Sequence, residues 1–343
     1  MKILVTGGAG YIGSHVVLEL LDAGHRVVVL DNLSTGFRRA VPRTVPLIVG
    51  DVGDELLVQR LCRAHGIEAI VHMAGSVVVP DSMTDPLGYY LNNTVKSRAL
   101  IAAAIAAGVE RFLFSSTAAV YGNPASNPVT EEAVLNPQSP YGTSKAMTEL
   151  MLADAARAHR FRYVALRYFN VAGADPQRRT GQSTRGATHL IKVACETALG
   201  KRASMSVFGT DYATRDGSCI RDFIHVTDLA RAHVAALGYL ERSEPSVVLN
   251  CGYARGFSVL EVIAAVRKAA GRDFPVEMAG RRPGDIAEIV ADSSKLRRLL
   301  AWTPRHADLD GIVSDALAWE ARSSDRLSGD LEEQETVART AAE

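Results

Sequence analysis

The sequence contains few cysteines, and no two of them stand at a spacing that binds metals. Only four occur among 343 residues, namely Cys62, Cys195, Cys219 and Cys251. Because none belongs to a CxxC pair, they do not support a thiolate zinc site or a disulfide scaffold. We therefore expect reduced cysteines that serve packing, and we predict no metal in the functional site.

The sequence also lacks an excess of one charge and lacks long hydrophobic runs. Lysine plus arginine and aspartate plus glutamate number 38 each, so no whole-chain field attracts nucleic acid or an anionic membrane. No apolar run reaches the roughly 18 residues of a membrane span. The amino terminus, MKILVTGGAG, reaches glycine too early for a signal peptide. These absences predict a cytoplasmic protein with no nucleic-acid or membrane partner.

The chain does contain enough apolar residues, 47% of the total, to bury the core of an enzyme. Its first half alternates short apolar runs with segments of helix length. The predicted strands are 2–6, 26–30, 46–49, 69–72, 111–115 and 162–168, and the predicted helices are 11–23, 55–65, 85–107 and 140–159. This alternation predicts an α/β fold of the Rossmann type, with a doubly wound parallel sheet and helices on both faces.

Beyond residue 170 the alternation gives way to a polar, glycine-containing stretch and shorter elements. We expect residues 1–170 and about 224–252 to form a dinucleotide-binding domain. Residues of about 171–223 and 253–322 are expected to form a smaller mixed α/β substrate domain. Residues 323–343 are polar and acidic without apolar periodicity, which predicts a frayed tail.

A glycine-rich turn follows the first predicted strand. In TGGAGYIGS, Gly7, Gly10 and Gly13 stand between that strand and a helix, where backbone N–H groups and the helix N-terminus bind phosphates. Asp31 ends the second strand about 20 residues further on, where a carboxylate accepts the ribose hydroxyls of NAD and repels a 2′-phosphate. Asp51 follows the third strand and is expected to contact the adenine. The turn therefore predicts NAD as the cofactor.

Tyr141 and Lys145 in SPYGTSK are four residues apart on one face of a predicted helix that begins at Ser139 and Pro140. An unperturbed phenol has a pKa of about 10, so proton transfer at neutral pH requires positive charge nearby. We expect Lys145 and an oxidised nicotinamide to supply that charge. A tyrosine and lysine at this spacing are common on solvated helices, but their place behind a dinucleotide turn favours catalysis.

Longer motifs make the chain resemble a known family. TGGAGYIG, FSSTAAVYG and SPYGTSK together resemble the extended short-chain dehydrogenase/reductase family. LDNLSTG, LRYFNVAGA, IRDFIHVTDLA, NCGYARGFSVLEV and RRPGDIAEIVADSSK are similar to the UDP-hexose 4-epimerase branch of that family, and the similarity covers about residues 1–320. The resemblance implies tightly bound NAD, a UDP-sugar substrate and a transient 4-keto sugar.

The resemblance also assigns roles to individual residues. Tyr141 matches the base, Lys145 the residue that holds the cofactor ribose, and Thr117 the hydroxyl that contacts the sugar oxygen. Related 4,6-dehydratases carry an acidic pair directly after this last position, whereas this chain has Ala118 and Ala119, which favours epimerisation. The expected NAD contacts are Gly7, Gly10, Tyr11, Ile12, Gly13, Asp31, Asn32, Asp51, Val52, Met73, Ala74, Gly75, Asn92, Thr117, Tyr141, Lys145 and Phe169.

The expected substrate contacts come from both halves of the chain. Arg221 and Arg282 match the diphosphate ligands, for which guanidinium groups are suited. Asp285 matches the acceptor for the uridine ribose, and Ile289 the residue whose bulk limits sugar size. The full set of expected substrate contacts is Thr117, Tyr141, Asn170, His189, Leu190, Val207, Phe208, Arg221, Arg282 and Asp285.

Several alternatives stay open on the sequence alone. The leading hypothesis is interconversion of UDP-galactose and UDP-glucose, and the nearest rivals are 4-epimerases of UDP-N-acetylhexosamines, UDP-glucuronate or UDP-pentoses. A nucleotide-sugar-binding protein without turnover and a reductase that consumes NADH are further options.

Val77 stands where relatives have a lysine near the nicotinamide. The alanine-rich helices 85–107 and 140–159 predict a homodimer.

Overall fold

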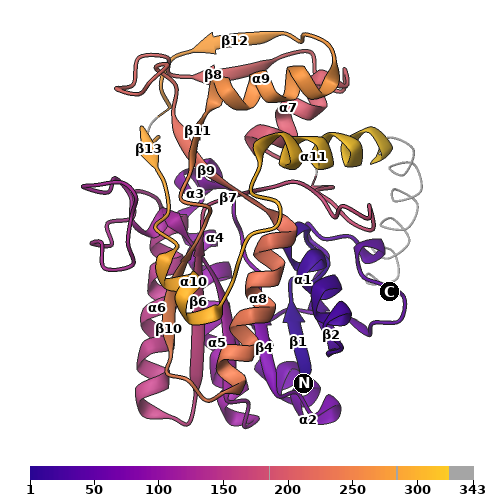
Figure 1. Ribbon diagram of the computed structural model, residues 1–343. Helices are drawn as coiled ribbons and strands as arrows, with labels where there is room; N and C mark the ends of the chain where they lie inside the picture. Colours follow the sequence, from indigo (N-terminus) through magenta and orange to yellow (C-terminus); the bar gives the residue numbers. More distant parts are fainter. Residues whose placement is uncertain (185, 283–284, 324–343) are drawn as a thin grey trace.

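A seven-stranded parallel sheet forms the centre of the molecule in the computed structural model, which describes residues 1–184, 186–282 and 285–323. Its strands run in the order β10-β6-β5-β4-β1-β2-β3 (Figure 1). From β1 the chain adds β2 and β3 on one side and then β4, β5, β6 and β10 on the other, so the strand order reverses between β1 and β4. The strands are β1 (Lys2–Thr6), β2 (Arg26–Asp31), β3 (Leu47–Val49), β4 (Ala69–His72), β5 (Arg111–Thr117), β6 (Arg162–Tyr168) and β10 (Val247–Cys251). The predicted doubly wound Rossmann-type sheet is confirmed.

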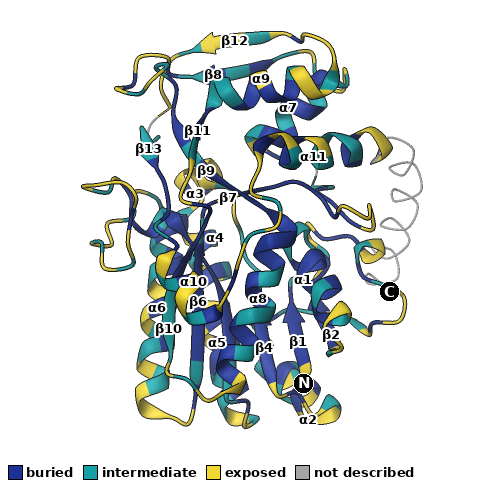
Figure 2. Cartoon of the chain, in the orientation of Figure 1, coloured by how far each residue is buried: buried dark blue, intermediate teal, exposed yellow. Residues whose placement is uncertain are grey.

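Helices cover both faces of this sheet. Ile3 and Val5 of β1 belong to a core shared with α1 (Tyr11–Asp22) and α8 (Val226–Glu241), whereas Leu4 points to the other face. That second core contains side chains of α2 (Glu55–His65), α5 (Lys96–Ala106) and α6 (Pro140–Ala158). Successive strand residues point to opposite faces, so burial of both sets explains why these strands are almost continuously apolar. Figure 2 shows the strands buried and the outer helix surfaces exposed.

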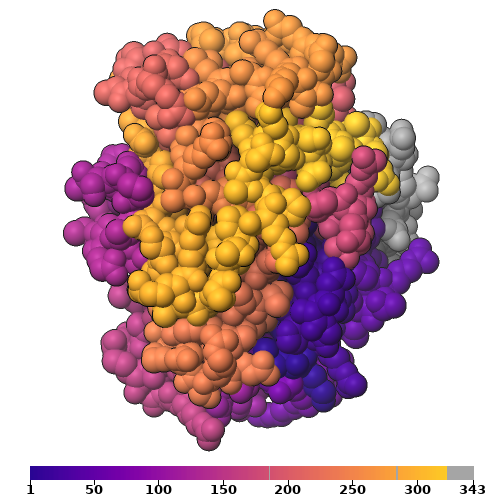
Figure 3. Space-filling view, viewed as in Figure 1, coloured from indigo at the N-terminus to yellow at the C-terminus, as the bar shows by residue number. Residues whose placement is uncertain are grey.

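A smaller layer lies above the carboxyl ends of the large sheet (Figure 1). It contains the parallel pair β8 (Met205–Phe208) and β12 (Val276–Ala279), with α7 (Leu190–Ala198), α9 (Val259–Ala270) and α11 (Leu309–Ser323). A four-stranded sheet connects the two layers and consists of β7 (Asn170–Ala172), β9 (Ile220–His225), β11 (Gly256–Ser258) and β13 (Glu288–Ile289). The space-filling view shows α10 (Ser294–Leu300) and α11 in yellow on the face toward the viewer (Figure 3).

The predicted helix 85–107 consists of three successive segments, namely α4 (Pro86–Tyr89), the π-helical segment η2 (Tyr90–Val95) and α5. A further short helix, α3 (Val79–Thr84), precedes them. The remaining short helices are η1 (Arg38–Ala40) and η3 (Ala118–Val120). A widened turn of this kind displaces side chains from the regular helical positions and is frequent at functional sites. The predicted tail begins at the last residue of α11, and residues 324–343 lie outside the described part of the chain.

None of the helices in the described residues is long and apolar enough to cross a membrane.

Candidate active site

The glycine turn leads directly into α1 and leaves the start of this helix open. Gly10 caps the helix without a side-chain hydrogen bond, and the first turn has no acidic residue. Gly7 has φ of 70°, and a Cβ there would lie 2.6 Å from the backbone nitrogen of Ala74. A Cβ at Gly13 would lie 2.1 Å from the Gly7 carbonyl oxygen. Gly7 and Gly13 therefore permit a backbone turn that other residues cannot form, and its N–H groups suit a pyrophosphate. Tyr11 and Ile12 form the first residues of the helix.

Asp31 is buried beside this turn at the end of β2. Its Oδ2 accepts the N–H of Ala9 at 2.9 Å, and its Oδ1 accepts the N–H of Leu33 at 2.8 Å. Burial raises the pKa of this carboxyl group, while the two backbone hydrogen bonds act in the opposite direction. Each carboxylate oxygen has two lone pairs, so the oxygens retain acceptor capacity for ribose hydroxyls. Asn32 is exposed, and its side chain accepts the N–H of Ser34 at 3.1 Å.

Asp51 and Val52 lie at the opposite rim of the expected cofactor site. Asp51 forms an ion pair with Lys96 and accepts the N–H of Gly53 at 2.7 Å. Burial alone would raise the pKa of Asp51, but these two partners bring it below its usual value. Val52 is buried in the core beneath. Lys96, which the sequence motifs did not point to, therefore fixes the carboxylate that is expected to contact adenine.

The π-helical segment brings two asparagines to the loop after β4, which contains Met73, Ala74 and Gly75. Asn92 donates to the Ser76 hydroxyl at 2.9 Å. The buried Asn93 accepts the Ser76 N–H at 2.8 Å and donates to Ser144 of α6 at 3.1 Å. Asn92 was expected on the cofactor side, whereas Asn93 was missed. Its burial follows from the π turn, which a helical sequence pattern does not reveal.

Thr117 and Tyr141 meet where α6 approaches the end of β5. Ser139 caps α6 by accepting the N–H of Gly142 at 3.2 Å. A Cβ at Gly142 would lie 2.6 Å from the carbonyl oxygen of Ala119, so glycine allows the helix to approach this closely. Tyr141 lies close enough to Thr117 for an interaction that lowers the pKa of its phenol. The structure thus brings together the predicted base and the predicted sugar-contacting hydroxyl.

The pKa of Tyr141 lies above its ordinary value in the protein without cofactor. Burial raises the pKa of Tyr141 to about 12, and the interaction with Thr117 offsets this rise only in part. Desolvation dominates the pKa of Tyr141 in the protein without cofactor, and the positive charge expected from Lys145 together with an oxidised nicotinamide stays a prediction. Burial also lowers the pKa of Lys145 to about 8. The Lys145 ammonium donates to the Ser115 carbonyl oxygen at 3.0 Å and lies 5.0 Å from the centre of the Phe114 ring.

A buried ion pair holds the same face of α6 against the sheet. Glu149 stands four residues after Lys145 and pairs with Arg167 of β6, with both side chains only 6% exposed. Glu149 also accepts a hydrogen bond from Ser116, the neighbour of Thr117. Arg167 donates to the Tyr121 hydroxyl at 2.9 Å. The sequence analysis missed this pair, although the spacing of 141, 145 and 149 places all three on one helix face.

A small apolar cluster begins at Ala118, the residue that follows Thr117. Ala118, Phe169 and Ile289 are buried together in it. Phe169 precedes Asn170 at the start of β7, and Ala118 follows Thr117. Ile289, the expected size-limiting residue, therefore shares a cluster with Ala118 and Phe169, which are the sequence neighbours of Thr117 and Asn170. Val77, the expected departure from relatives, is exposed.

Other expected substrate residues surround a small cavity between β7, α7 and α11. Asn170, His189 and Leu190 line it, together with Gln182 and Trp319. Nδ1 of His189 and the amide of Gln182 lie 2.9 Å apart. The structure places these three expected residues together, and it adds Gln182 and α11, which the motifs did not indicate.

The remaining expected residues lie near the outer edge of the smaller layer. Arg282 stacks on Phe208 at 4.4 Å from the ring centre and pairs with Asp285 at 3.0 Å. Val207 is buried beside Phe208 on β8. Arg221 of β9 donates to the Ile220 carbonyl oxygen at 2.9 Å and pairs in register with Ile289. Arg282 and Asp285 thus contact each other, whereas Arg221 lies on the four-stranded sheet that connects the two layers.

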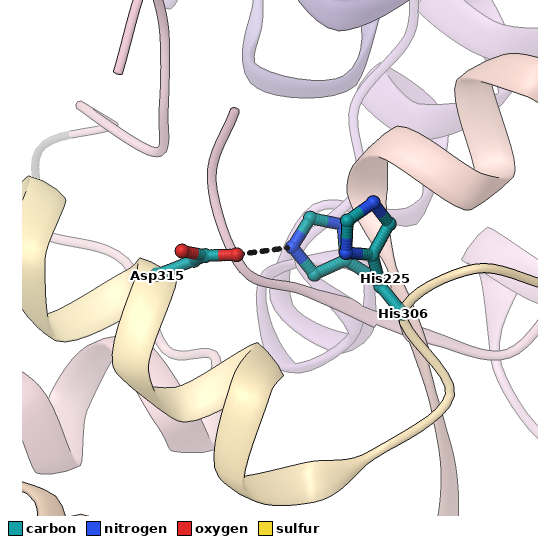
Figure 4. A group of neighbouring side chains, drawn as sticks. All are labelled: His225, His306 and Asp315. Atoms are coloured by element: carbon teal, nitrogen blue, oxygen red, sulfur yellow. Dashed lines mark hydrogen bonds and ion pairs between the residues drawn. The ribbon is translucent and has the colours of Figure 1, made fainter. Parts of the chain in front are cut away.

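One further group of possible metal ligands lies outside this site. His225, His306 and Asp315 place one ligand atom each within 4.8 Å of one another (Figure 4). Nδ1 of His225 accepts the N–H of Thr227 at 3.1 Å, so the neutral ring carries its proton on Nε2 and donates it to Asp315 at 3.2 Å. A metal-binding nitrogen must carry no proton. The group is therefore a hydrogen-bonded pair with a stacked second ring.

The fold and the site together define a class of protein: α/β enzymes of the short-chain dehydrogenase/reductase type, with a dinucleotide turn at one end of the sheet and a tyrosine and lysine beside it. The chain belongs to the NAD dependent epimerase/dehydratase family, whose family model matches residues 3–252.

Individual relatives narrow the comparison. The chain is 55% identical over 319 residues to the UDP-glucose 4-epimerase of Azospirillum brasilense, an alignment that covers 93% of this chain and 92% of the relative. The solved structure of UDP-glucose 4-epimerase from Brucella ovis in complex with NAD matches with a TM-score of 0.90 and 41% identity, covering 92% and 97% of the two chains. The UDP-Glc/GlcNAc 4-epimerase from Campylobacter jejuni matches with a TM-score of 0.82 and 48% identity, covering 94% and 99%.

Proposed function

We propose that the protein is a UDP-glucose 4-epimerase, an isomerase that interconverts UDP-galactose and UDP-glucose with NAD as a bound cofactor. The observation that carries this proposal is the contact of Tyr141 with Thr117, next to Lys145 and opposite the glycine turn. The curated relative that is 55% identical is a UDP-glucose 4-epimerase, which supports the same reaction.

The residues present fit NAD. The open start of α1 suits the pyrophosphate, and the Asp31 carboxylate suits unmodified ribose hydroxyls. A 2′-phosphate would meet this carboxylate and be repelled, which favours NAD over NADP. Bound NAD supplies a reversible hydride acceptor for carbon 4 of the sugar.

The side chains of the site account for the proton steps. Tyr141 takes the proton of the 4-hydroxyl while the hydride leaves carbon 4, so the sugar becomes a 4-keto compound. Thr117 holds the sugar oxygen by a hydrogen bond. The keto sugar then presents its opposite face, the hydride returns to carbon 4, and Tyr141 returns the proton to the oxygen. Substrate and product differ only at carbon 4, so no cofactor is consumed.

The positive charge of the site should favour the ionised form of Tyr141 during this step. The Lys145 ammonium lies in a buried environment, where charges interact strongly. An oxidised nicotinamide, which is cationic, would supply a second charge of the same sign. These charges act against the desolvation that holds the pKa of Tyr141 at about 12 in the protein alone.

The nucleotide-sugar is proposed to span the two layers of the fold. Residues 1–170 and about 224–252 hold NAD, and about 171–223 and 253–322 hold the UDP group. The proposed diphosphate ligands are Arg221 and Arg282, and the proposed ribose acceptor is Asp285. Binding of UDP then requires Arg282 to exchange its contact with Asp285 for the phosphate.

We further propose a homodimer. Met83, Leu87, Leu91 and Val95 are exposed apolar residues at intervals of four along α3, α4 and η2. Met147 and Leu150 are exposed on the adjacent α6. An apolar surface of this kind marks an interaction site, and a second copy would bury it symmetrically.

The proposed location is the cytoplasm, where the NAD and UDP-sugar pools that the reaction needs are located. Cell fractionation with an antibody to the chain tests this location.

One experiment tests the proposed reaction. The purified protein is incubated with UDP-galactose and, separately, with UDP-N-acetylgalactosamine, without added cofactor, and the products are resolved by NMR. Conversion to the gluco epimers is expected for UDP-galactose. A UDP-sugar that binds without conversion, even after NAD is added, would support a binding protein instead.

A second candidate substrate class is the N-acetylated sugars. The Campylobacter jejuni neighbour is a UDP-Glc/GlcNAc 4-epimerase. Ile289 is smaller than an aromatic residue at this position of the wall, so conversion of both substrates in the same experiment is consistent with a broad sugar site.

A further inference from the structure

The loop between η3 and α6 is fastened to the segment that carries Ile289. The side-chain amide of Asn127 donates to the Glu288 carbonyl oxygen at 3.1 Å, and its Oδ1 accepts the Val290 N–H at 2.9 Å. Two backbone hydrogen bonds continue the contact, from Val129 N–H to Val290 O and from Asp292 N–H to Val129 O, both at 2.8 Å. One amide thus binds the backbone on each side of Ile289.

The bonds of Asn127 fix its orientation. Its nitrogen faces a carbonyl and its oxygen faces an N–H, so a flip of the amide would lose both hydrogen bonds. The other edge of β13 pairs with β9, where Ile289 stands opposite Arg221. The Ile289 backbone is therefore held between β9 and the Asn127 side chain.

The Ile289 side chain is directed into the wall of the site. It is 4% exposed and packs in the cluster that contains Ala118 and Phe169. Ala118 follows Thr117, and Phe169 precedes Asn170. A small shift of the β13 backbone would therefore change the space beside the sugar, without movement of Thr117 or Tyr141.

We propose that Asn127 is a positioning residue that sets how far Ile289 projects toward the sugar, and so controls which UDP-hexoses fit. This inference rests on the proposed 4-epimerase function. Asn127 itself is exposed at the surface, so water can replace its hydrogen bonds after substitution, and the protein should fold without it.

The test compares Asn127→Ala with the wild-type protein, both with NAD bound, on UDP-galactose and UDP-N-acetylgalactosamine. Loss of one or two ordinary hydrogen bonds predicts an increase of about two- to tenfold in kcat/KM for the acetamido sugar relative to UDP-galactose. The kcat for UDP-galactose and its pH profile should stay unchanged, because Tyr141 is not moved. Asn123→Ala, an exposed asparagine of the same loop, is the matched control.

A double-mutant cycle shows whether Asn127 acts through Ile289. In an Ile289→Ala background, the Asn127→Ala change should leave the preference between the two sugars unaltered, because the side chain that it positions is gone. If the wild type converts neither sugar, the proposed function fails, and the inference fails with it. If the wild type converts UDP-galactose but Asn127→Ala leaves the preference unchanged, or changes it equally without Ile289, only the inference is overturned.

Discussion

Tyr141 and Lys145 are both buried, and burial shifts their pKa values in opposite directions. The pKa of the tyrosine rises to about 12, and that of the lysine falls to about 8. Both shifts have the same origin, since a low-dielectric environment disfavours whichever form is charged. At neutral pH the lysine is still mostly protonated and the phenol is neutral. In the proposed mechanism, the cofactor charge would therefore have a task beyond hydride transfer, because the Tyr141 phenol is neutral in the protein without cofactor.

Replacement of Tyr141 by phenylalanine tests this role directly. The ring remains, so packing against the site and binding of UDP should be retained. Loss of the proton acceptor should reduce kcat by about 10²–10⁴-fold, measured as epimerisation of UDP-galactose by NMR. Tyr168→Phe is the matched control, because this neighbouring hydroxyl bonds to Ser115 and lies outside the proposed machinery. Equal losses in the two variants would mean that a general change in packing, not a missing base, explains the effect.

Three buried histidines make stability depend on pH at the level of single residues. Burial lowers the pKa of His72 to about 3, and those of His15 and His233 to about 4, from an ordinary value of 6.5. The unfolded chain therefore binds protons below pH 6.5 that the folded chain does not bind. The stabilising effect of a neutral histidine is complete above that pH and is lost as the pH falls toward the folded-state pKa.

His233 gives the clearest measurement, because its ring lies within α8 and bonds only to the Leu229 carbonyl oxygen among the described residues. Between pH 7.5 and 5.5 its protonation in the unfolded state should lower the free energy of unfolding by about 1.4 kcal/mol. His233→Gln should remove this contribution, so urea unfolding at the two pH values should show a smaller decrease in the variant. An identical decrease in both proteins would contradict the assigned shift.

At the scale of elements, the helix α1 depends on a turn that tolerates no side chain. A Cβ at Gly13 would approach backbone atoms of Gly7 and Gly8, which cannot rotate away as a side chain would. Gly13→Ala should therefore distort the turn and yield protein with little bound NAD, measured as cofactor released per chain after denaturation. Gly238→Ala in α8 is the control, because its Cβ would meet only one distant side-chain atom, and the substitution should keep full NAD content. Full NAD content in Gly13→Ala would exclude the turn as the pyrophosphate site.

The elements that the sequence predicts best are those with local causes. The six predicted strands of the large sheet match within two residues at their ends, because buried parallel strands are continuous apolar runs. The helix starting at Pro140 follows from Ser139 and proline at its first position. The glycine turn follows from steric contacts within a few residues.

Contacts between distant segments leave no local pattern in the sequence. β7, β9 and β13 are short, and they pair across intervals of about 50 to 70 residues, so no local pattern marks them. The Asn127 contacts with β13 and the ion pair of Glu149 with Arg167 arise in the same way. The burial that raises the pKa of Tyr141 depends on the whole fold, whereas the positive charge of Lys145 is visible in the motif.

At the scale of the whole molecule, the catalytic helix α6 has two different faces. One face carries Tyr141, Lys145 and Glu149 toward the sheet. The other carries the exposed Met147 and Leu150, next to the exposed apolar residues of α4 and η2. A partner subunit on this outer face would lie directly behind the catalytic side chains. Dimerisation would therefore stabilise the helix that positions the base.

Leu87 is the residue on which this dimer is best tested, since it is 77% exposed on α4. In a dimer, Leu87→Glu would place two carboxylates in an apolar interface, where an unpaired charge is costly. Light scattering at micromolar concentration should then give the monomer mass, whereas the wild type gives twice that mass. Leu56→Glu is the matched control, because Leu56 is 71% exposed on α2, which carries none of the residues of this surface, and the variant should remain dimeric. If the wild type is itself a monomer, the apolar surface has another role, and α6 keeps its position through contacts within the chain, among them the Glu149 ion pair and the hydrogen bond of Asn93 to Ser144.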